Sequence, residues 1–237
     1  MITVSWSVIN SYDICPMKVE HEENNVLHSI SWPMAWGNIG HVGLAAWARG
    51  EDWRKAVDAE AQLYISRKAS QKNWNGEFSD NTGVIERAEV IDLLTKYTSD
   101  IDRKPNPKMV EQNLTRDLGD GVWLTGRVDW LEVPIVDWKF TRNPLYLSPI
   151  QALCYAILNG GPCEFEYHAL VKARNPYWDV VPVKETEKQE NLDRVIEYKI
   201  KPIAKKIEAK MFGANPEHRL CSEVYCGYWN MCPGRFI

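Results

Sequence analysis

The stretch GRVDWLEVPIVDWKF, from Gly126 to Phe140, decides the fold of this 237-residue chain. It is rich in β-formers on both sides of Pro134. This pattern predicts two strands joined by a tight turn, Gly121 to Val133 and Ile135 to Phe140. Neighbouring strands lie about 4.8 Å apart, so residues on the two strands can meet across the turn.

Three charged residues in this stretch suggest chemistry. Asp129 is on the first strand and Asp137 on the second, so their carboxylates can converge on one cation. Lys139 follows two residues after Asp137, which places both side chains on one face. Carboxylates suit Mg²⁺ or Mn²⁺, and a metal beside an ammonium group suits phosphodiester cleavage. The alternative is a surface hairpin with a salt bridge, and so short a pattern alone does not decide between the two.

The flanking segments predict a mixed α/β sheet with helices packed on it. Asp120-Gly121 is a hairpin signal, Ser148-Pro149 an expected helix start, and Gly160-Gly161 a helix stop. Pro202 is expected to kink the last helix. Further strands are predicted at Met109 to Leu114, Glu164 to Lys172 and Trp178 to Val183, and helices at Ser7 to Ile14 (stopped by Pro16), near Asn38, over Asp52 to Asp102, and at Ile150 to Leu158 and Lys188 to Met211.

Length and composition predict one domain. Residues 1–105 form its mainly helical part, 106–185 its sheet core, and 186–237 a helix and cysteine-rich tail. Neither a membrane helix nor a secretory signal is expected, and six unevenly spaced cysteines suggest a reducing compartment. We therefore expect a cytoplasmic protein, in the host cytoplasm if viral. The net charge of -4 does not indicate nucleic-acid binding by itself; the basic stretches 67–72 and 199–210 could meet phosphate or be solvated helix faces.

Five elements occur in order along the chain: SYDICP (Ser11 to Pro16), GNIGH (Gly37 to His41), GRVDWLE with IVDWKF, the Gln151 to Tyr155 segment, and a terminal cysteine set. The ordered set resembles the RecB-like branch of the PD-(D/E)XK nuclease superfamily, which includes AddB-type nuclease domains, CRISPR-associated RecB-like exonucleases and many phage exonucleases. The resemblance spans nearly the whole chain. It implies a restriction-endonuclease-like mixed sheet flanked by helices. It also implies a Mg²⁺- or Mn²⁺-dependent exonuclease acting on single-stranded DNA or DNA ends in recombination, repair or phage DNA processing.

The resemblance also implies a role for each matching residue. It makes Asp129, Asp137, Lys139 and Glu111 catalytic, assigns the metal to His41, Asp129, Asp137 and the backbone carbonyl of Trp138, and places Gln151 and Tyr155 against the DNA strand. Without the resemblance, His41 would be a capping or packing residue of its helix and Tyr155 a core residue.

The cysteines suggest a second metal site. Cys221, Cys226 and Cys232 are closely spaced in the tail, and Cys15 is the natural fourth ligand. The resemblance implies a [4Fe-4S] cluster that fastens the tail to the first helix, and four cysteines also suit zinc. The gap from Cys221 to Cys226 is longer than the two-residue gap of the family. Cys154 and Cys163 fall outside the pattern and are expected to be buried.

Two other functions stay open at this point. The chain could trim DNA ends during CRISPR spacer acquisition, with adaptation or recombination proteins as partners, using the same catalytic residues. It could also be a non-catalytic, zinc-stapled DNA-binding module. The complete set of candidate catalytic residues argues against the second alternative.

Overall fold

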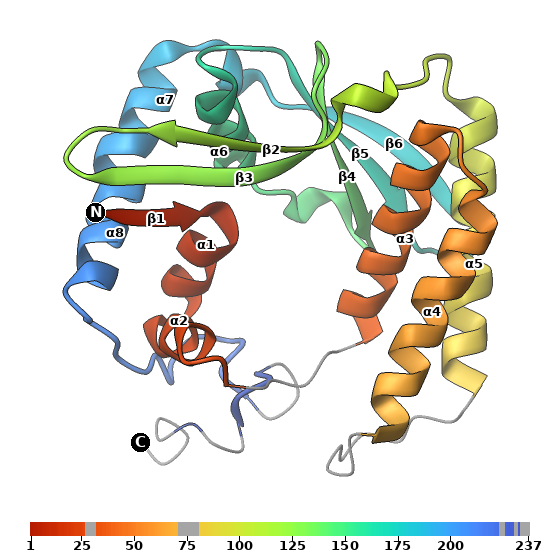
Figure 1. The fold of residues 1–237 in the computed structure, drawn as a ribbon, viewed down its shortest axis with the longest axis horizontal. Helices are drawn as coiled ribbons and strands as arrows, with labels where there is room; N and C mark the ends of the chain where they lie inside the picture. Colours follow the sequence, from red (N-terminus) through yellow and green to blue (C-terminus); the bar gives the residue numbers. More distant parts are fainter. Residues whose placement is uncertain (27–31, 71–80, 223–225, 230–231, 233–237) are drawn as a thin grey trace.

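The computed structural model describes residues 1–26, 32–70, 81–222, 226–229 and 232. Within these residues, six strands form one mixed sheet (Figure 1). They are β1 (Ile2–Ser5), β2 (Val110–Asp117), β3 (Val122–Trp130), β4 (Ile135–Thr141), β5 (Phe165–Val171) and β6 (Tyr177–Pro182). The pairs β1–β3 and β4–β5 are parallel, and the pairs β2–β3, β3–β4 and β5–β6 are antiparallel.

Helices cover both faces of the sheet. One group packs beside β4 to β6: α3 (Trp32–Arg49), α4 (Trp53–Ser70) and α5 (Asn81–Asp100). The other face carries α6 (Pro149–Asn159), α7 (Gln189–Val195) and α8 (Lys201–Glu208), while α1 (Trp6–Ile14) and α2 (Pro16–Glu23) follow β1.

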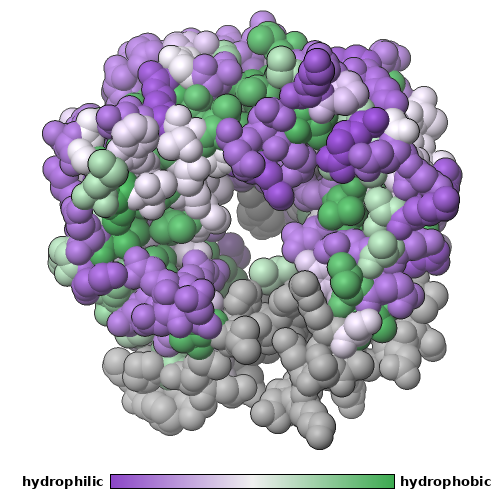
Figure 2. Space-filling view, viewed as in Figure 1, coloured by the Kyte–Doolittle hydropathy of each residue, from purple (hydrophilic) through white to green (hydrophobic). Residues whose placement is uncertain are grey.

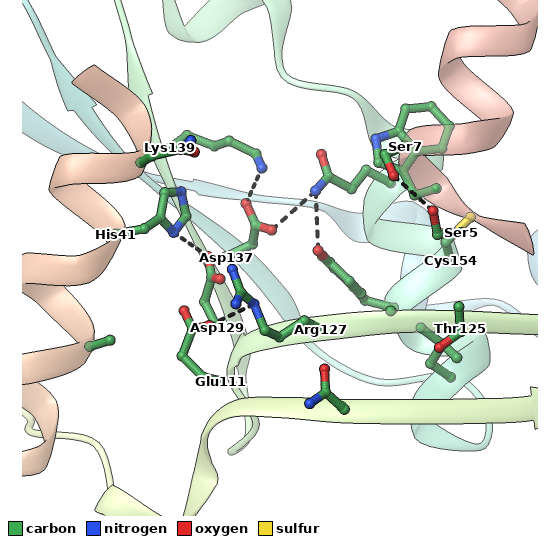
Figure 3. A pocket seen from close by; sticks show the side chains of 18 of the residues that line it. Ser5, Ser7, His41, Glu111, Thr125, Arg127, Asp129, Asp137, Lys139 and Cys154 are labelled. Atoms are coloured by element: carbon green, nitrogen blue, oxygen red, sulfur yellow. Dashed lines mark hydrogen bonds and ion pairs between the residues drawn. The ribbon is translucent and has the colours of Figure 1, made fainter. Parts of the chain in front are cut away.

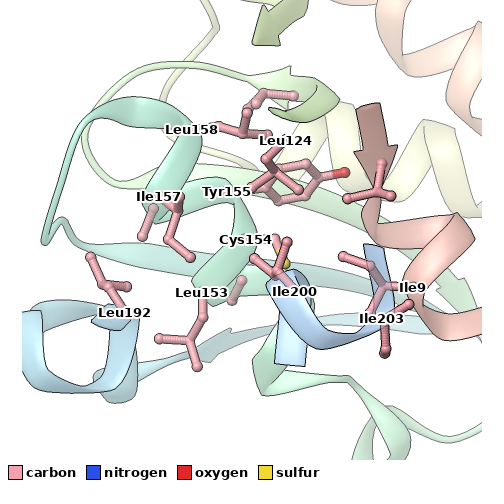
Figure 4. Close-up of a cluster of buried hydrophobic side chains, with 14 of the residues drawn as sticks. Ile9, Leu124, Leu153, Cys154, Tyr155, Ile157, Leu158, Leu192, Ile200 and Ile203 are labelled. Atoms are coloured by element: carbon pink, nitrogen blue, oxygen red, sulfur yellow. The ribbon is translucent and has the colours of Figure 1, made fainter. Parts of the chain in front are cut away.

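Each helix group buries its own hydrophobic core. Leu153, Ile157 and Ile203 belong to the core between α6, α8 and the sheet (Figure 4). Leu44 and Leu94 belong to the core between α3, α5 and the other face. Alternation along β4 divides the strand between the two cores, because successive side chains point to opposite faces.

The local turn signals work largely as predicted. Asp120 and Gly121 both adopt positive φ in the turn between β2 and β3. Pro149 occupies the first turn of α6, and Gly160 ends it with φ 110°. Ser148, however, makes no capping hydrogen bond with its side chain; its backbone carbonyl instead accepts a hydrogen bond from the Tyr167 hydroxyl at 2.6 Å.

The chain differs from the sequence prediction in several places; for example, β3 ends at Trp130 and not at Val133, and the helical stretch from Asp52 to Asp102 contains two helices, α4 and α5. The N-terminal part also contains β1, which pairs in parallel with β3 more than a hundred residues away. Pro16 ends α1 and also begins α2, since the first helical turn needs no N–H from proline. Before Pro202, the last helix takes a π-helical turn over Ile196–Ile200, and α8 then continues.

The basic stretch 199–210 makes ion pairs within the protein. Lys199 pairs with Asp13, Lys201 with Asp120 and Lys210 with Glu23. The side chains of the other basic stretch, 67–72, lie outside the described residues. No helix of the described chain is both long and apolar enough to span a bilayer.

Candidate metal centre

Asp129 and Asp137 lie where β3 and β4 separate. Trp130 pairs with Val136, so the next residues away from the turn are these two aspartates. The Asp129 Oδ2 atom accepts a hydrogen bond from the Trp138 backbone N–H at 2.9 Å. The carboxylate therefore occupies the gap that opens between the strands, and both aspartates are buried.

His41 reaches this gap from α3. Its Nδ1 lies 3.3 Å from Asp129 Oδ2. Gly40 makes this approach possible, because a Cβ at this position would overlap the ring of Phe140 on β4. The small residue lets helix and strand pack closely, and this contact sets the height of His41 above the sheet.

Glu111 enters the site from β2 through an unusual backbone conformation. Its φ is 56°, in the left-handed region that costs a non-glycine residue about 1–2 kcal/mol. Strain of this kind clusters at functional sites. The Glu111 carboxylate lies 2.6 Å from the Nε of Arg127, an exposed residue on β3.

Ligand atoms of His41, Glu111 and Asp129 all lie within 4.8 Å of one another. An imidazole and two carboxylates are suitable ligands for Mg²⁺, Mn²⁺ or another divalent cation. Figure 3 shows these side chains converging from three elements, with Asp137 beside them. The structure thus brings together His41 and Asp129, which are 88 positions apart in sequence.

Asp137 is held by two neighbours. Lys139 Nζ lies 2.6 Å from Asp137 Oδ2, and Gln151 Nε2 donates to Oδ1 at 3.2 Å. Within the described chain, the buried Oδ2 atom accepts no hydrogen bond with good geometry, although it contacts the ammonium group. A carboxylate oxygen of this kind is suited to a cation.

Burial and neighbouring charges shift the pKa values of Asp129 and Asp137 in opposite directions. Burial raises the pKa of Asp137 to about 6, the charge on Asp129 adds to the rise, and Lys139 opposes it. Burial also disfavours ionised Asp129, but His41, Lys139 and the Trp138 N–H outweigh it and hold its pKa below the ordinary value. For His41, burial favours the neutral ring, and Asp129 overcomes this effect to raise its pKa. The cluster therefore repels a second negative charge, which a divalent cation would offset.

Gln151 and Tyr155 lie one turn apart on α6. Gln151 Nε2 is 3.3 Å from the Tyr155 hydroxyl, and the Tyr155 ring stacks on Phe165 with centroids 6.0 Å apart. Burial raises the pKa of Tyr155 well above its ordinary range. Both residues line the cavity that contains the acidic group, so they are placed to touch a ligand there.

The Trp138 side chain belongs to the buried core behind the site. Its indole N–H donates to the Tyr97 hydroxyl at 2.9 Å, and that hydroxyl bonds His168 Nδ1 at 2.6 Å. Trp138 is therefore anchored from behind, while its backbone N–H holds Asp129 in front.

The site opens into a cavity of about 940 Å³. One wall comes from α3 and α4, and the other from α1 and α6. Figure 2 shows the molecule hollowed between these walls, with hydrophilic residues along part of the opening. Arg49 and Arg127 add positive charge to the lining.

The cysteine-rich tail docks on the α1–α2 junction. The Asn215 N–H donates to Cys15 Sγ at 3.4 Å, and the Asn215 side-chain amide donates to the Ile14 carbonyl at 3.1 Å. Burial, followed by charge on Cys226, Cys15 and Cys232, raises the pKa of Cys221. The four cysteine side chains are thus near enough to interact electrostatically. Cys154 lies apart from them, buried in the core, where burial raises its pKa to about 12.

Sequence reasoning gave no role to Arg127, Gly40 and Phe140, nor to other cavity residues such as Arg49. Arg127 lies two residues before Asp129, so alternation along the strand places both on one strand face. Gly40 belongs to the GNIGH motif and Phe140 ends a predicted strand, and neither pattern indicates that the two residues meet. Their contact joins elements a hundred residues apart, so no local pattern could indicate it.

No protein-family model matches the chain, and no curated protein matches it in sequence. The fold is similar to a crystal structure from Eubacterium rectale that is described as a candidate exonuclease. The TM-score is 0.61 at 13% identity, and the match covers 92% of this chain and 86% of the other. This similarity confirms the predicted mixed α/β sheet flanked by helices. At this identity it establishes the fold alone.

Proposed function

We propose that this chain is a metal-dependent DNA nuclease of the RecB-like PD-(D/E)XK branch. The observation that carries the proposal is the convergence of His41, Glu111 and Asp129 beside a buried Asp137 that contacts Lys139. The shared fold with the candidate exonuclease supports it.

His41, Glu111, Asp129 and Asp137 would hold Mg²⁺ or Mn²⁺. A residue in a strand directs its N–H and C=O to the same side, so the Trp138 carbonyl also faces the β3 side and is available as a further oxygen ligand. Such a cation would activate water and stabilise charge on the phosphate.

Lys139 is the cationic side chain beside Asp137. Its ammonium group pairs with Asp137, and its side chain lines the cavity and is about a quarter exposed. From there it can donate a hydrogen bond to the attacking water or to a non-bridging phosphate oxygen. Gln151 holds the opposite side of Asp137 and so fixes the direction of the carboxylate.

The substrate we propose is single-stranded DNA or a DNA end, processed as an exonuclease does. The cavity passes between two protein walls, and the acidic cluster lies within it. A strand must enter this space to reach Asp129, and an unpaired end does so without opening a duplex. Recombination, repair and phage DNA processing are the settings that fit such a substrate.

A cleavage assay tests this function directly. End-labelled single-stranded, duplex and covalently closed circular DNA would be incubated with Mn²⁺ or with EDTA. We expect cleavage of single strands and ends in Mn²⁺ alone, and its loss in Lys139→Ala. Lys188→Ala is the matched control, because Lys188 is an exposed lysine away from the cavity.

Two results would contradict the proposal. Wild-type cleavage rates in purified Lys139→Ala would remove the catalytic role of the motif. Equally fast cutting of closed duplex circles would refute the requirement for an end or an unpaired strand.

For the cysteine set, we propose a [4Fe-4S] cluster held by Cys15, Cys221, Cys226 and Cys232. The tail docks beside Cys15 through Asn215, and four cysteines suit such a cluster or, as the alternative, a zinc ion. Elemental analysis of anaerobically purified protein tests it: iron and sulfide support the cluster, and zinc without iron refutes it.

A further inference from the structure

Trp6 lines the same cavity as Asp137 and Lys139 but has no role in the chemistry above. It is the first residue of α1 and is partly buried against the hydrophobic core behind it. Within the described chain, its indole makes no hydrogen bond and no contact with another ring. Most other tryptophans of the cores do have such partners; Trp138, for example, bonds Tyr97. The cavity therefore contains an aromatic side chain without a polar or aromatic partner.

This aromatic side chain lies across the cavity from the metal ligands. Ser5 and Ser7, its neighbours in sequence, lie on the wall opposite His41, as Figure 3 shows. Their hydroxyls are 2.7 Å apart and add polar groups beside the indole. Tyr155 of α6 also lines the cavity. Its hydroxyl accepts a hydrogen bond from Gln151, which also bonds Asp137. A strand with its phosphate at the carboxylates would extend along the same cavity, which Trp6 of α1 also lines.

The chemistry of this wall fits a nucleobase. Bases stack on aromatic side chains with about 1–3 kcal/mol per base, whatever their sequence. In a duplex each base is already covered by its stacked neighbours, and extruding it costs a few kcal/mol. An aromatic ring recessed in a cavity can therefore take a base from a single strand far more readily than from a duplex.

We propose that Trp6 forms a stacking site for an unpaired base of the DNA strand, next to the phosphate at the metal centre. The inference rests on the proposed nuclease function and adds to it a determinant of strand preference. Trp6 selects single-stranded DNA, and Ser5 and Ser7 supply hydrogen bonds to the polar edge of the base or to the adjoining phosphate.

The test measures DNA affinity separately from cleavage. In a Lys139→Ala background, fluorescence anisotropy would give the Kd for a labelled single-stranded oligonucleotide and for its duplex in Mg²⁺. Trp6→Leu should weaken single-strand binding roughly 5- to 150-fold, the loss of one stacked base at about 1.4 kcal/mol per tenfold. Trp6→Phe keeps a ring and should stay within about threefold. Duplex affinity should not change.

Trp123→Leu is the matched control. Trp123 is also partly buried, but it does not line the cavity. Its replacement should leave both affinities unchanged. Folding of each variant would be checked by circular dichroism, and the leucine at position 6 retains an apolar contact with the core.

Photo-cross-linking gives a second measurement that needs no substitution. Oligonucleotides carrying 5-iodouracil at successive positions from the end should cross-link to the peptide containing Trp6 at one position only. Unchanged single-strand affinity in Trp6→Leu, or cross-links confined to other peptides, overturns the stacking site and leaves metal-dependent cleavage standing. An equal loss of duplex affinity also overturns it, because the role of Trp6 is then structural. Absence of any DNA binding by the unsubstituted chain refutes the proposed function as well.

Discussion

Replacing Asp137 with asparagine should make the metal-free protein more stable while abolishing cleavage. Burial raises the pKa of Asp137 to about 6 in the folded chain, against an ordinary value of 3.8. The folded state therefore binds more protons than the unfolded state between these values, and stability falls as pH rises through this range. One pH unit corresponds to about 1.4 kcal/mol, so ionised Asp137 costs about 3 kcal/mol above pH 6.

Asparagine is close in shape to aspartate and carries no charge. Its amide can still accept a hydrogen bond from Gln151, and Lys139 loses an ion pair but remains partly exposed to water. We therefore expect Asp137→Asn to gain up to about 3 kcal/mol at pH 8, and only about 1 kcal/mol at pH 4.5, where the folded aspartate is already protonated.

The assay is urea unfolding in EDTA, followed by tryptophan fluorescence at both pH values. Asp92→Asn is the control, because Asp92 is an exposed aspartate on α5 and its change should stay within about 0.5 kcal/mol. Adding Mn²⁺ should stabilise the wild type and not Asp137→Asn, since binding to the folded state alone raises stability. A variant no more stable than wild type at pH 8, or a gain that does not depend on pH, would refute the reasoning.

Three further substitutions probe the supports of the site. Gly40→Ala places a methyl group into the ring of Phe140; calorimetry should show weakened Mn²⁺ binding, with a loss of about 1–3 kcal/mol in urea unfolding, and unchanged metal affinity would contradict the packing argument. Tyr97→Phe leaves the buried indole N–H of Trp138 without its acceptor, so unfolding experiments should show a loss of about 1–3 kcal/mol; full stability would mean that another group replaces the hydroxyl. Cys15→Ser should yield colourless protein with a tail more sensitive to proteolysis, and retention of a brown colour and of the iron content would exclude Cys15 as a ligand.

The candidate metal centre depends on a support that lies behind it. Tyr97 bonds Trp138 from α5, and Trp138 in turn holds Asp129 through its backbone N–H. This hydrogen bond holds β4 against α5 before any ligand binds. The site lies where β3 and β4 separate and no longer share backbone hydrogen bonds. The contact with α5 therefore helps to keep its geometry fixed.

Several features follow from the sequence because their signals are local. The strands on either side of Pro134 follow from their β-forming residues, and the turn at Asp120 follows from residues that tolerate positive φ. The spacing of Asp137 and Lys139 places both on one face of a strand, and the structure has them in contact. Periodicity and turn chemistry act over a few residues, so reading them requires no knowledge of the fold.

The tertiary structure alone decided the rest. The four residues of β1 pair with β3, more than a hundred positions later in the sequence. The residues Ile2 to Ser5 contain no pattern that predicts this pairing. The short distance between His41 and Asp129 depends on the close contact of Gly40 with Phe140. Trp6 lines the same cavity only because α1 packs beside it in the folded chain. These contacts arise from packing between segments that are distant in sequence. Packing depends on the three-dimensional shapes of both segments, and local sequence patterns do not specify those shapes.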